Sequence, residues 1–190
     1  MLADRRQGGE QVNSIKTVCF GEIMLRLKPP QAERLFQSPL LEATFGGGEA
    51  NVAVSLALFG LEAALVTVLP GNPVGDAALA ELRRHGIDTS RIVRSGKRLG
   101  IYFLEAGTNQ RPSVVIYDRA NSGMTQVGPG MFDWESVFEG ADWFHISGIT
   151  PALSQGTADL SLHAVREAKA RGVTVSCDYN YRGKLWNHGK

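Results

Sequence analysis

The sequence predicts an α/β fold, with a central parallel sheet, flanking helices and a small additional β sheet. Short runs of β-forming apolar residues alternate with segments whose apolar residues recur every three or four positions, as in strand–helix–strand units. Two other stretches contain strand-like segments with no helix between them. The first pattern favours parallel strands, and the second favours antiparallel ones.

The first strand and the first helix are predicted close to the start of the folded chain. Residues 16–23, KTVCFGEI, are rich in β-forming residues. In residues 48–59, Val52, Leu56 and Phe59 share one helical face, and Gly60 follows where a helix commonly ends. We expect this helix to pack on a sheet.

The same rhythm continues through the rest of the chain. A strand, a helix and a second strand in succession imply parallel pairing with a right-handed crossover. The predicted strands are 62–69, 91–94, 141–147 and 173–178, and the predicted helices are 76–85 and 157–171.

Two segments interrupt this rhythm, at about 24–45 and 98–119. Each contains strand-like runs without an intervening helix, and a short loop with Gly107 and Asn109 joins the runs of the second segment. We expect them to form a small antiparallel β lid on the α/β body.

Composition excludes several classes of protein. The 190 residues are 43% hydrophobic, and the formal net charge of +1 comes from scattered charges, so no basic surface for nucleic acid is expected. The apolar stretches are too short to cross a bilayer. Cys19 and Cys177 lie in apolar β-like runs, which is typical of buried reduced thiols and indicates a cytoplasmic protein. The histidines show no ligand spacing, so no metal site is expected from them.

The most distinctive local motif is FGGGEANVA, residues 45–53. Glycines let the backbone approach a ligand, and a helix start offers N–H groups to an oxygen-rich partner. A tight strand-to-helix turn without a ligand is an equally typical meaning of this pattern. The motif is not a dinucleotide-binding fingerprint, because Asn51 stands where the third glycine belongs.

A second motif, DYNYRGKLW, residues 178–186, follows an apolar strand. Ligands bind at the carboxyl ends of strands in open α/β sheets. If the chain stays extended, Asp178, Asn180 and Arg182 lie on one side and converge on one place. A solvated loop is the alternative interpretation.

A third group comprises Tyr102, Tyr117 and Arg119. Tyr117 and Arg119 are two residues apart on a predicted strand, so a phenol and a guanidinium would share a face. Such pairs are common on protein surfaces, and spacing alone favours a structural role.

Taken together, GGGEAN, VLPGNPVGD, HISGITPALS and DYNYRGKLW resemble the motifs of the PfkB/ribokinase family of sugar kinases, and within it the 2-keto-3-deoxygluconate kinases. The resemblance extends from about residue 17 to residue 186, and Glu49 and Pro70 depart from the common family pattern. It implies a ribokinase-like fold truncated before its C-terminal half. Residues 1–14 would be a disordered leader, and 15–190 would be the N-terminal part of the kinase domain.

The resemblance also implies roles for residues around the sugar. Gly47 would contact the sugar chain through its backbone, and Asn51 would face the pocket. Tyr102 would pack over the substrate from the lid, and Ile149 would line the pocket.

By the same resemblance, Tyr117, Arg119 and Arg182 would hold the acid end of the substrate. Two guanidinium groups and a phenol suit a carboxylate, which they bind with charge-assisted bonds. A neutral sugar would not need two arginines. A keto-deoxy sugar acid is therefore the expected substrate.

The implied reaction transfers the γ-phosphoryl group of ATP to the terminal hydroxyl of 2-keto-3-deoxygluconate, with Mg²⁺ neutralising the phosphates. Glu22, Asp178 and Asn180 would lie near the phosphates and Mg²⁺. The family's catalytic aspartate belongs to a Gly-Ala-Gly-Asp motif, which this sequence lacks. We therefore expect no catalytic residue in this chain, an inactive isolated chain, and an exposed sheet edge that limits solubility.

Two other functions stay open. One is a non-catalytic sugar-acid binding or dimerisation module, and the other is a fructose or nucleoside kinase of the same fold. The family's lids commonly pair between subunits, so a homodimer is the expected assembly.

Overall fold

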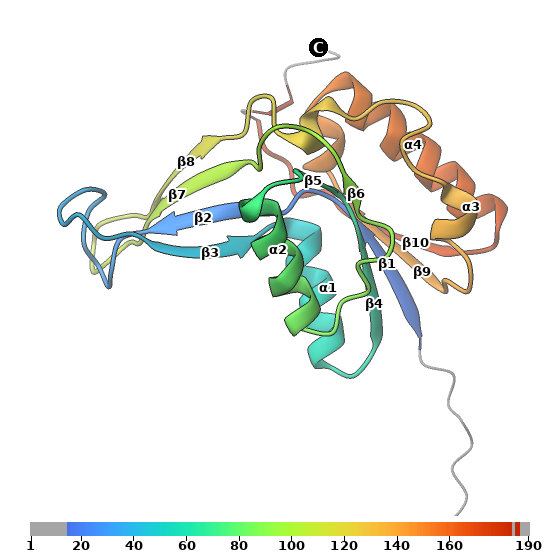
Figure 1. Cartoon of the computed structure of the whole chain (residues 1–190), viewed down its shortest axis with the longest axis horizontal. Coiled ribbons are helices and arrows are strands. Elements are labelled where there is room, and N and C mark those ends of the chain that lie inside the picture. Colours follow the sequence, from blue (N-terminus) through green and yellow to red (C-terminus); the bar gives the residue numbers. More distant parts are fainter. Residues whose placement is uncertain (1–14, 184, 187–190) are drawn as a thin grey trace, which may run out of the picture.

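The computed structural model describes residues 15–183 and 185–186, and Figure 1 shows the arrangement of its elements. The predicted leader at 1–14 lies outside the described residues. The central sheet has the order β10-β9-β1-β4, and every pair in it is parallel. Its strands are β1 (Lys16–Phe20), β4 (Glu62–Val66), β9 (Trp143–Ser147) and β10 (Thr174–Asp178).

Helices cover both faces of this sheet, as Figure 1 shows. Alternate residues of β1 point to opposite faces, so Val18 and Phe20 join one buried cluster and Cys19 joins the other. The helices are α1 (Gly48–Leu58) and α2 (Pro73–Arg84) on the side of Cys19, and α3 (Trp134–Val137) and α4 (Gln155–Ala170) on the side of Phe20. Burial on both faces explains the apolar runs of the strands. The predicted α/β class is confirmed.

Capping residues set the helix starts. Asn72 caps α2 by accepting a hydrogen bond from the Gly75 N–H at 3.0 Å, and Ser154 with Thr157 forms a capping box at α4. Both helices therefore begin before the predicted positions of 76 and 157.

The predicted strand 62–69 is divided at Thr67. Its second part, β5 (Val68–Leu69), pairs with β6 (Val93–Arg94) in a separate two-stranded parallel sheet. The short predicted strand at 91–94 is therefore present, but it lies outside the central sheet.

The lid is a second four-stranded sheet, which projects from one end of the α/β body in Figure 1. Its order is β3-β2-β7-β8, formed by β2 (Met24–Lys28), β3 (Glu42–Gly46), β7 (Ile101–Glu105) and β8 (Val114–Asp118). The outer pairs are antiparallel as predicted, but the central pair, β2 with β7, is parallel. The lid is therefore mixed, which corrects the expectation of a purely antiparallel sheet.

The two thiols differ in their surroundings. Cys19 is buried, and burial, assisted by the charge of Glu49, raises the pKa of its thiol to about 12. Cys177 is exposed on β10, an edge strand of the central sheet, so the prediction that both thiols are buried is wrong for Cys177. Two short 3-10 turns, Gly123–Gln126 and Thr150–Ala152, complete the described elements. Across the described residues, every helix falls short of the length and apolarity that crossing a membrane requires.

Candidate functional site

A cavity of about 300 Å³ lies between the lid and the carboxyl ends of the central strands. This is the position where ligands bind in open α/β sheets. Nine of the ten residues singled out in the sequence line it: Glu22, Gly47, Asn51, Tyr102, Tyr117, Arg119, Ile149, Asn180 and Arg182. The structure thus brings together segments that are far apart in the chain.

The start of α1 forms one wall of the cavity. Gly47 is the N-cap of α1, and a Cβ atom there would lie 2.0 Å from the backbone oxygen of Glu22. Only glycine lets these two segments approach so closely. One turn further, the Asn51 side-chain oxygen accepts a hydrogen bond from the Gly47 N–H at 3.5 Å.

The lid contributes an aromatic wall. Tyr102 and Tyr117 face each other across β7 and β8, with ring centroids 5.9 Å apart. The guanidinium carbon of Arg119 lies 4.7 Å from the centroid of the Tyr117 ring, in a cation–π contact. The predicted shared face of Tyr117 and Arg119 is therefore present in the structure.

Arg119 lies beside a buried acid. Its Nε lies 3.5 Å from a carboxylate oxygen of Glu22, which is 4% exposed, and the hydroxyl of Ser122 donates to the other oxygen at 2.7 Å. Burial raises the pKa of Glu22, whereas Arg119 and Ser122 act in the opposite direction. Glu22 lies under the lid as the partner of Arg119, a role that the sequence analysis did not anticipate.

Arg182 has a different environment. It is exposed, and its guanidinium donates a long hydrogen bond of 3.4 Å to the Tyr181 carbonyl. Among the described residues, no carboxylate forms an ion pair with it. Its positive charge is therefore available to an anionic ligand.

The residues after β10 do not stay extended. The Asn180 N–H donates to the Asp178 side chain at 2.9 Å, and Asn180 has a positive φ of 35°. This turn separates the carboxylate of Asp178 from the cavity, whereas Asn180 and Arg182 line it. The predicted convergence of all three side chains is wrong for Asp178, because that prediction required extended chain.

Ile149 reaches the cavity from the turn after β9. The Gly148 N–H donates to the Asp178 carbonyl at 2.8 Å. A Cβ atom on Gly148 would lie only 2.1 Å from the backbone oxygen of Tyr179. Close packing of these two turns places Ile149 beside the start of α1. If Gly48 carried a Cβ atom, that atom would lie 3.7 Å from the Cδ1 atom of Ile149.

Glu49 also lines the cavity, although it is only 1% exposed. From the sequence it was noted only as a departure from a family pattern. Its hydrogen-bond donors, Ser147 and Thr150, are 98 and 101 residues away, so local pattern could not reveal its environment.

The described residues show no cluster of acids that could hold Mg²⁺. Within the part of the chain that the structure describes, no three His, Cys, Asp or Glu side chains group closely enough to hold a metal. Glu22 is paired with Arg119, and Asp178 is exposed and bound to the Asn180 N–H. Each of these two acids is therefore already engaged by a neighbouring group.

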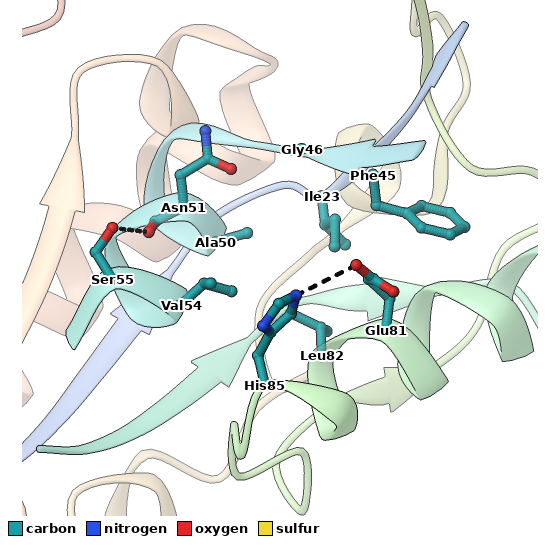
Figure 2. Close-up of a pocket in the computed structure, with 10 residues that line it drawn as sticks. All are labelled: Ile23, Phe45, Gly46, Ala50, Asn51, Val54, Ser55, Glu81, Leu82 and His85. Carbon is teal, nitrogen blue, oxygen red and sulfur yellow. Dashed lines mark hydrogen bonds and ion pairs between the residues drawn. The ribbon is translucent and has the colours of Figure 1, made fainter. Parts of the chain in front are cut away.

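A second cavity, of about 270 Å³, lies between α1 and α2 (Figure 2). Asn51 lines both cavities. Figure 2 shows Glu81 of α2 joined to His85, the residue at the C-cap of α2. The two side chains are 3.3 Å apart, and Arg84 also pairs with Glu81 at 2.7 Å. The acid in this cavity is therefore already engaged.

Comparisons with known proteins agree with this architecture. Residues 14–190 match the model of the pfkB family of carbohydrate kinases. A 2-dehydro-3-deoxygalactonokinase of Haloferax volcanii is 40% identical over 170 residues, and a 2-dehydro-3-deoxygluconokinase of Bacillus subtilis is 29% identical over 174 residues. Each alignment covers 90% of this chain and 53% of the relative, so the chain spans about half the length of these relatives.

The solved structure of 2-dehydro-3-deoxygluconokinase from Thermotoga maritima is 53% identical and superposes with a TM-score of 0.89. The superposition covers 90% of this chain and 53% of the Thermotoga maritima chain. The family match extends over nearly all of the chain, and the fold, including the lid, agrees with it. The chain therefore belongs to the pfkB family of carbohydrate kinases.

Proposed function

We propose that this chain forms the sugar-acid half of a kinase site that phosphorylates 2-keto-3-deoxygluconate, or its galactonate epimer, at the terminal hydroxyl. The observation that carries the proposal is the cavity under the lid, where exposed Arg182 is the available cation and Tyr102, Tyr117 and Asn51 supply hydrogen-bonding groups. The similarity to 2-dehydro-3-deoxyaldonate kinases supports the same substrate class.

In this reaction the terminal hydroxyl oxygen of the sugar acid bonds to the γ-phosphorus of ATP. The bond between that phosphorus and the bridging oxygen of ADP breaks, and the hydroxyl proton passes to a carboxylate base. ATP supplies the phosphoryl group, and Mg²⁺ neutralises its charge. The residues of this chain bind and orient the acid, which lowers the barrier by alignment.

The test is calorimetric titration of the 190-residue chain with 2-keto-3-deoxygluconate and, separately, with fructose. We expect the acid to bind and fructose not to bind. Arg182→Ala should weaken binding of the acid by about tenfold or more, because one charge-assisted hydrogen bond contributes about 1.5–3 kcal/mol. Arg171→Ala, at the exposed end of α4, is the matched control and should bind normally.

Equal binding of fructose, or unchanged affinity after Arg182→Ala, would instead favour a kinase for a neutral sugar or nucleoside. We expect no phosphoryl transfer by the chain alone, since the described residues show no cluster of acids that could hold the metal. That same observation favours a second candidate function, a sugar-acid binding module. Binding of the acid that is unchanged by ATP and Mg²⁺ would support it.

We further propose that the lid mediates a homodimer of a cytoplasmic protein. Support for the dimer comes from β8, where Val114 and Ile116 are exposed on the same face of a lid edge strand. Exposed apolar residues grouped in this way are typical of protein–protein contacts. Two free cysteines without a disulfide support the cytoplasmic location.

A further inference from the structure

Glu49 is a fully buried acid in the first turn of α1. One oxygen, Oε1, accepts three hydrogen bonds: from the Ser147 N–H at 3.1 Å, the Ser147 hydroxyl at 2.7 Å and the Thr150 hydroxyl at 2.8 Å. Burying a carboxylate is costly unless donors compensate for the lost water. Three donors and the favourable end of the helix dipole provide that compensation.

Space for this side chain is made by a glycine. A Cβ atom on Gly21, directly after β1, would lie 2.3 Å from Cδ and from Oε2 of Glu49. The carboxylate is therefore enclosed between the end of β1 and the turn after β9. It cannot move without disturbing one of these segments.

The network extends to a wall of the cavity. The Ser147 hydroxyl, which donates to Glu49, also accepts the Ile149 N–H at 3.1 Å. Ile149 lines the cavity, and a Cβ atom on neighbouring Gly48 would lie 3.7 Å from the Ile149 side chain and 3.9 Å from that of Asn180. One carboxylate oxygen thus ties the start of α1 to the turn that carries Ile149.

The donors to Glu49 are Ser147, the last residue of β9, and Thr150 in the turn that follows. Their hydrogen bonds link this segment directly to a side chain of α1. A cluster of satisfied buried hydrogen bonds specifies one arrangement of the groups around it.

We propose that Glu49 is a positioning residue, which sets the distance between the two walls of the sugar-acid pocket and so controls affinity for the sugar acid. This inference rests on the proposed function for its ligand. Its geometric part, the tie between α1 and the turn after β9, can be tested without any ligand.

The first measurement is the affinity of the chain for 2-keto-3-deoxygluconate in three variants. Glu49→Gln keeps an oxygen that can accept the three donors, so affinity should stay within about threefold of the original. Glu49→Ala removes the acceptor and should weaken binding by more than about tenfold. Thr150→Val removes one donor with little change of shape and should weaken binding by about two- to fivefold.

A control separates positioning from general stability. The Ser161 hydroxyl, buried in α4, donates to the Thr157 carbonyl at 2.6 Å and does not line the cavity under the lid. Ser161→Ala therefore deletes a comparable buried hydrogen bond elsewhere. It should lower thermal stability about as much as Thr150→Val while leaving affinity unchanged.

The second measurement is amide hydrogen exchange in the segment 145–153, without ligand. Exchange should be faster in Glu49→Ala and Thr150→Val than in Glu49→Gln or Ser161→Ala. If the unchanged chain binds no sugar acid, the proposed function fails, but exchange still tests the tie. Equal exchange in all variants would overturn the positioning role, as would unchanged affinity in folded Glu49→Ala or Thr150→Val.

Discussion

Charge in the cavity under the lid is balanced residue by residue. Arg119 faces Glu22, and Glu49 is satisfied by hydroxyl and amide donors. Arg182 alone among these charged groups is both exposed and free of an ion pair with a described carboxylate. Arg182 is therefore the more accessible of the two arginines in motifs that suggest anion binding, and loss of its charge should weaken binding of a carboxylate.

Replacing Glu22 by glutamine should alter how stability depends on pH. Burial raises the pKa of Glu22 above its ordinary value of 4.5, and Glu49 adds to this shift, while Arg119 and Ser122 oppose it. A carboxyl whose pKa is raised by folding stabilises the fold fully below 4.5, and that contribution is lost as the pH rises through the raised pKa. As the pH rises, the free energy of unfolding of the original protein should therefore fall relative to that of Glu22→Gln. The difference should change by at most about 1.4 kcal/mol per pH unit.

Urea unfolding of both proteins between about pH 4 and pH 8 measures this difference. Glu42→Gln, in an exposed pair with Lys28, is the control and should give a difference that hardly changes with pH. A difference that grows in favour of the original protein as the pH rises would mean that Arg119 outweighs burial at Glu22.

Most residues of the cavity could be predicted from the sequence, because their spacing and their family motifs are local. Asp178 could not, because the chain turns at Asn180 and does not stay extended. The role of Glu49 could not be predicted either, because the donors to its carboxylate lie about a hundred residues further along the chain. Local pattern contains neither kind of information.

At the level of elements, the close approach of α1 to the end of β1 depends on Gly47. Gly47→Ala would place a Cβ atom 2.0 Å from the backbone oxygen of Glu22, which cannot yield like a flexible side chain. We expect it to lower the free energy of unfolding by about 1–3 kcal/mol, the range for overpacking. Gly71→Ala meets no atom within 4 Å and should change stability by less than about 0.5 kcal/mol.

Chemical denaturation of both alanine variants makes the comparison. Equal stabilities would show that the segment around Gly47 shifts at little cost. In that case the close contact between Gly47 and the Glu22 backbone would not be needed to keep α1 in its place beside the cavity.

The elements were predicted well where apolar periodicity is clear, as in α2, α4 and the four central strands. For α1 the position was predicted but the buried face was wrong, because α1 buries Glu49, Ala50 and Ala53 while Phe59 is 80% exposed. Helix starts were placed too late because Asn72 and Ser154 cap turns that precede the apolar pattern. The parallel pairing of β2 with β7 could not be predicted, since the strands belong to separate hairpins and no sequence pattern records their relative direction.

For the whole molecule, the question is which exposed apolar surface mediates association. Ile116 on β8 is 51% exposed, and Leu162 on α4 is 52% exposed beside an apolar cavity near β10. If the lid forms the dimer, Ile116→Lys should shift the protein to monomer, whereas Leu162→Lys should leave the assembly unchanged. Sedimentation velocity of the two variants measures this.

The opposite result, dissociation by Leu162→Lys alone, would place the contact on the side of α4 and β10. Among the described strands β10 pairs on one side only, with β9, and a strand edge of this kind readily pairs with other chains. Both substitutions add one positive charge at nearly equal exposure, so a general effect of charge would act on both.

The parallel pair at the centre of the lid also has a consequence for synthesis on the ribosome. The hairpin of β2 and β3 is complete once Gly46 has emerged, but its partner β7 ends at Glu105, about 60 residues later. At about 5–20 residues per second, this delay lasts roughly 3–12 seconds. An isolated two-stranded hairpin is only marginally stable in water, so the nascent lid is open to chaperones and proteases throughout that interval.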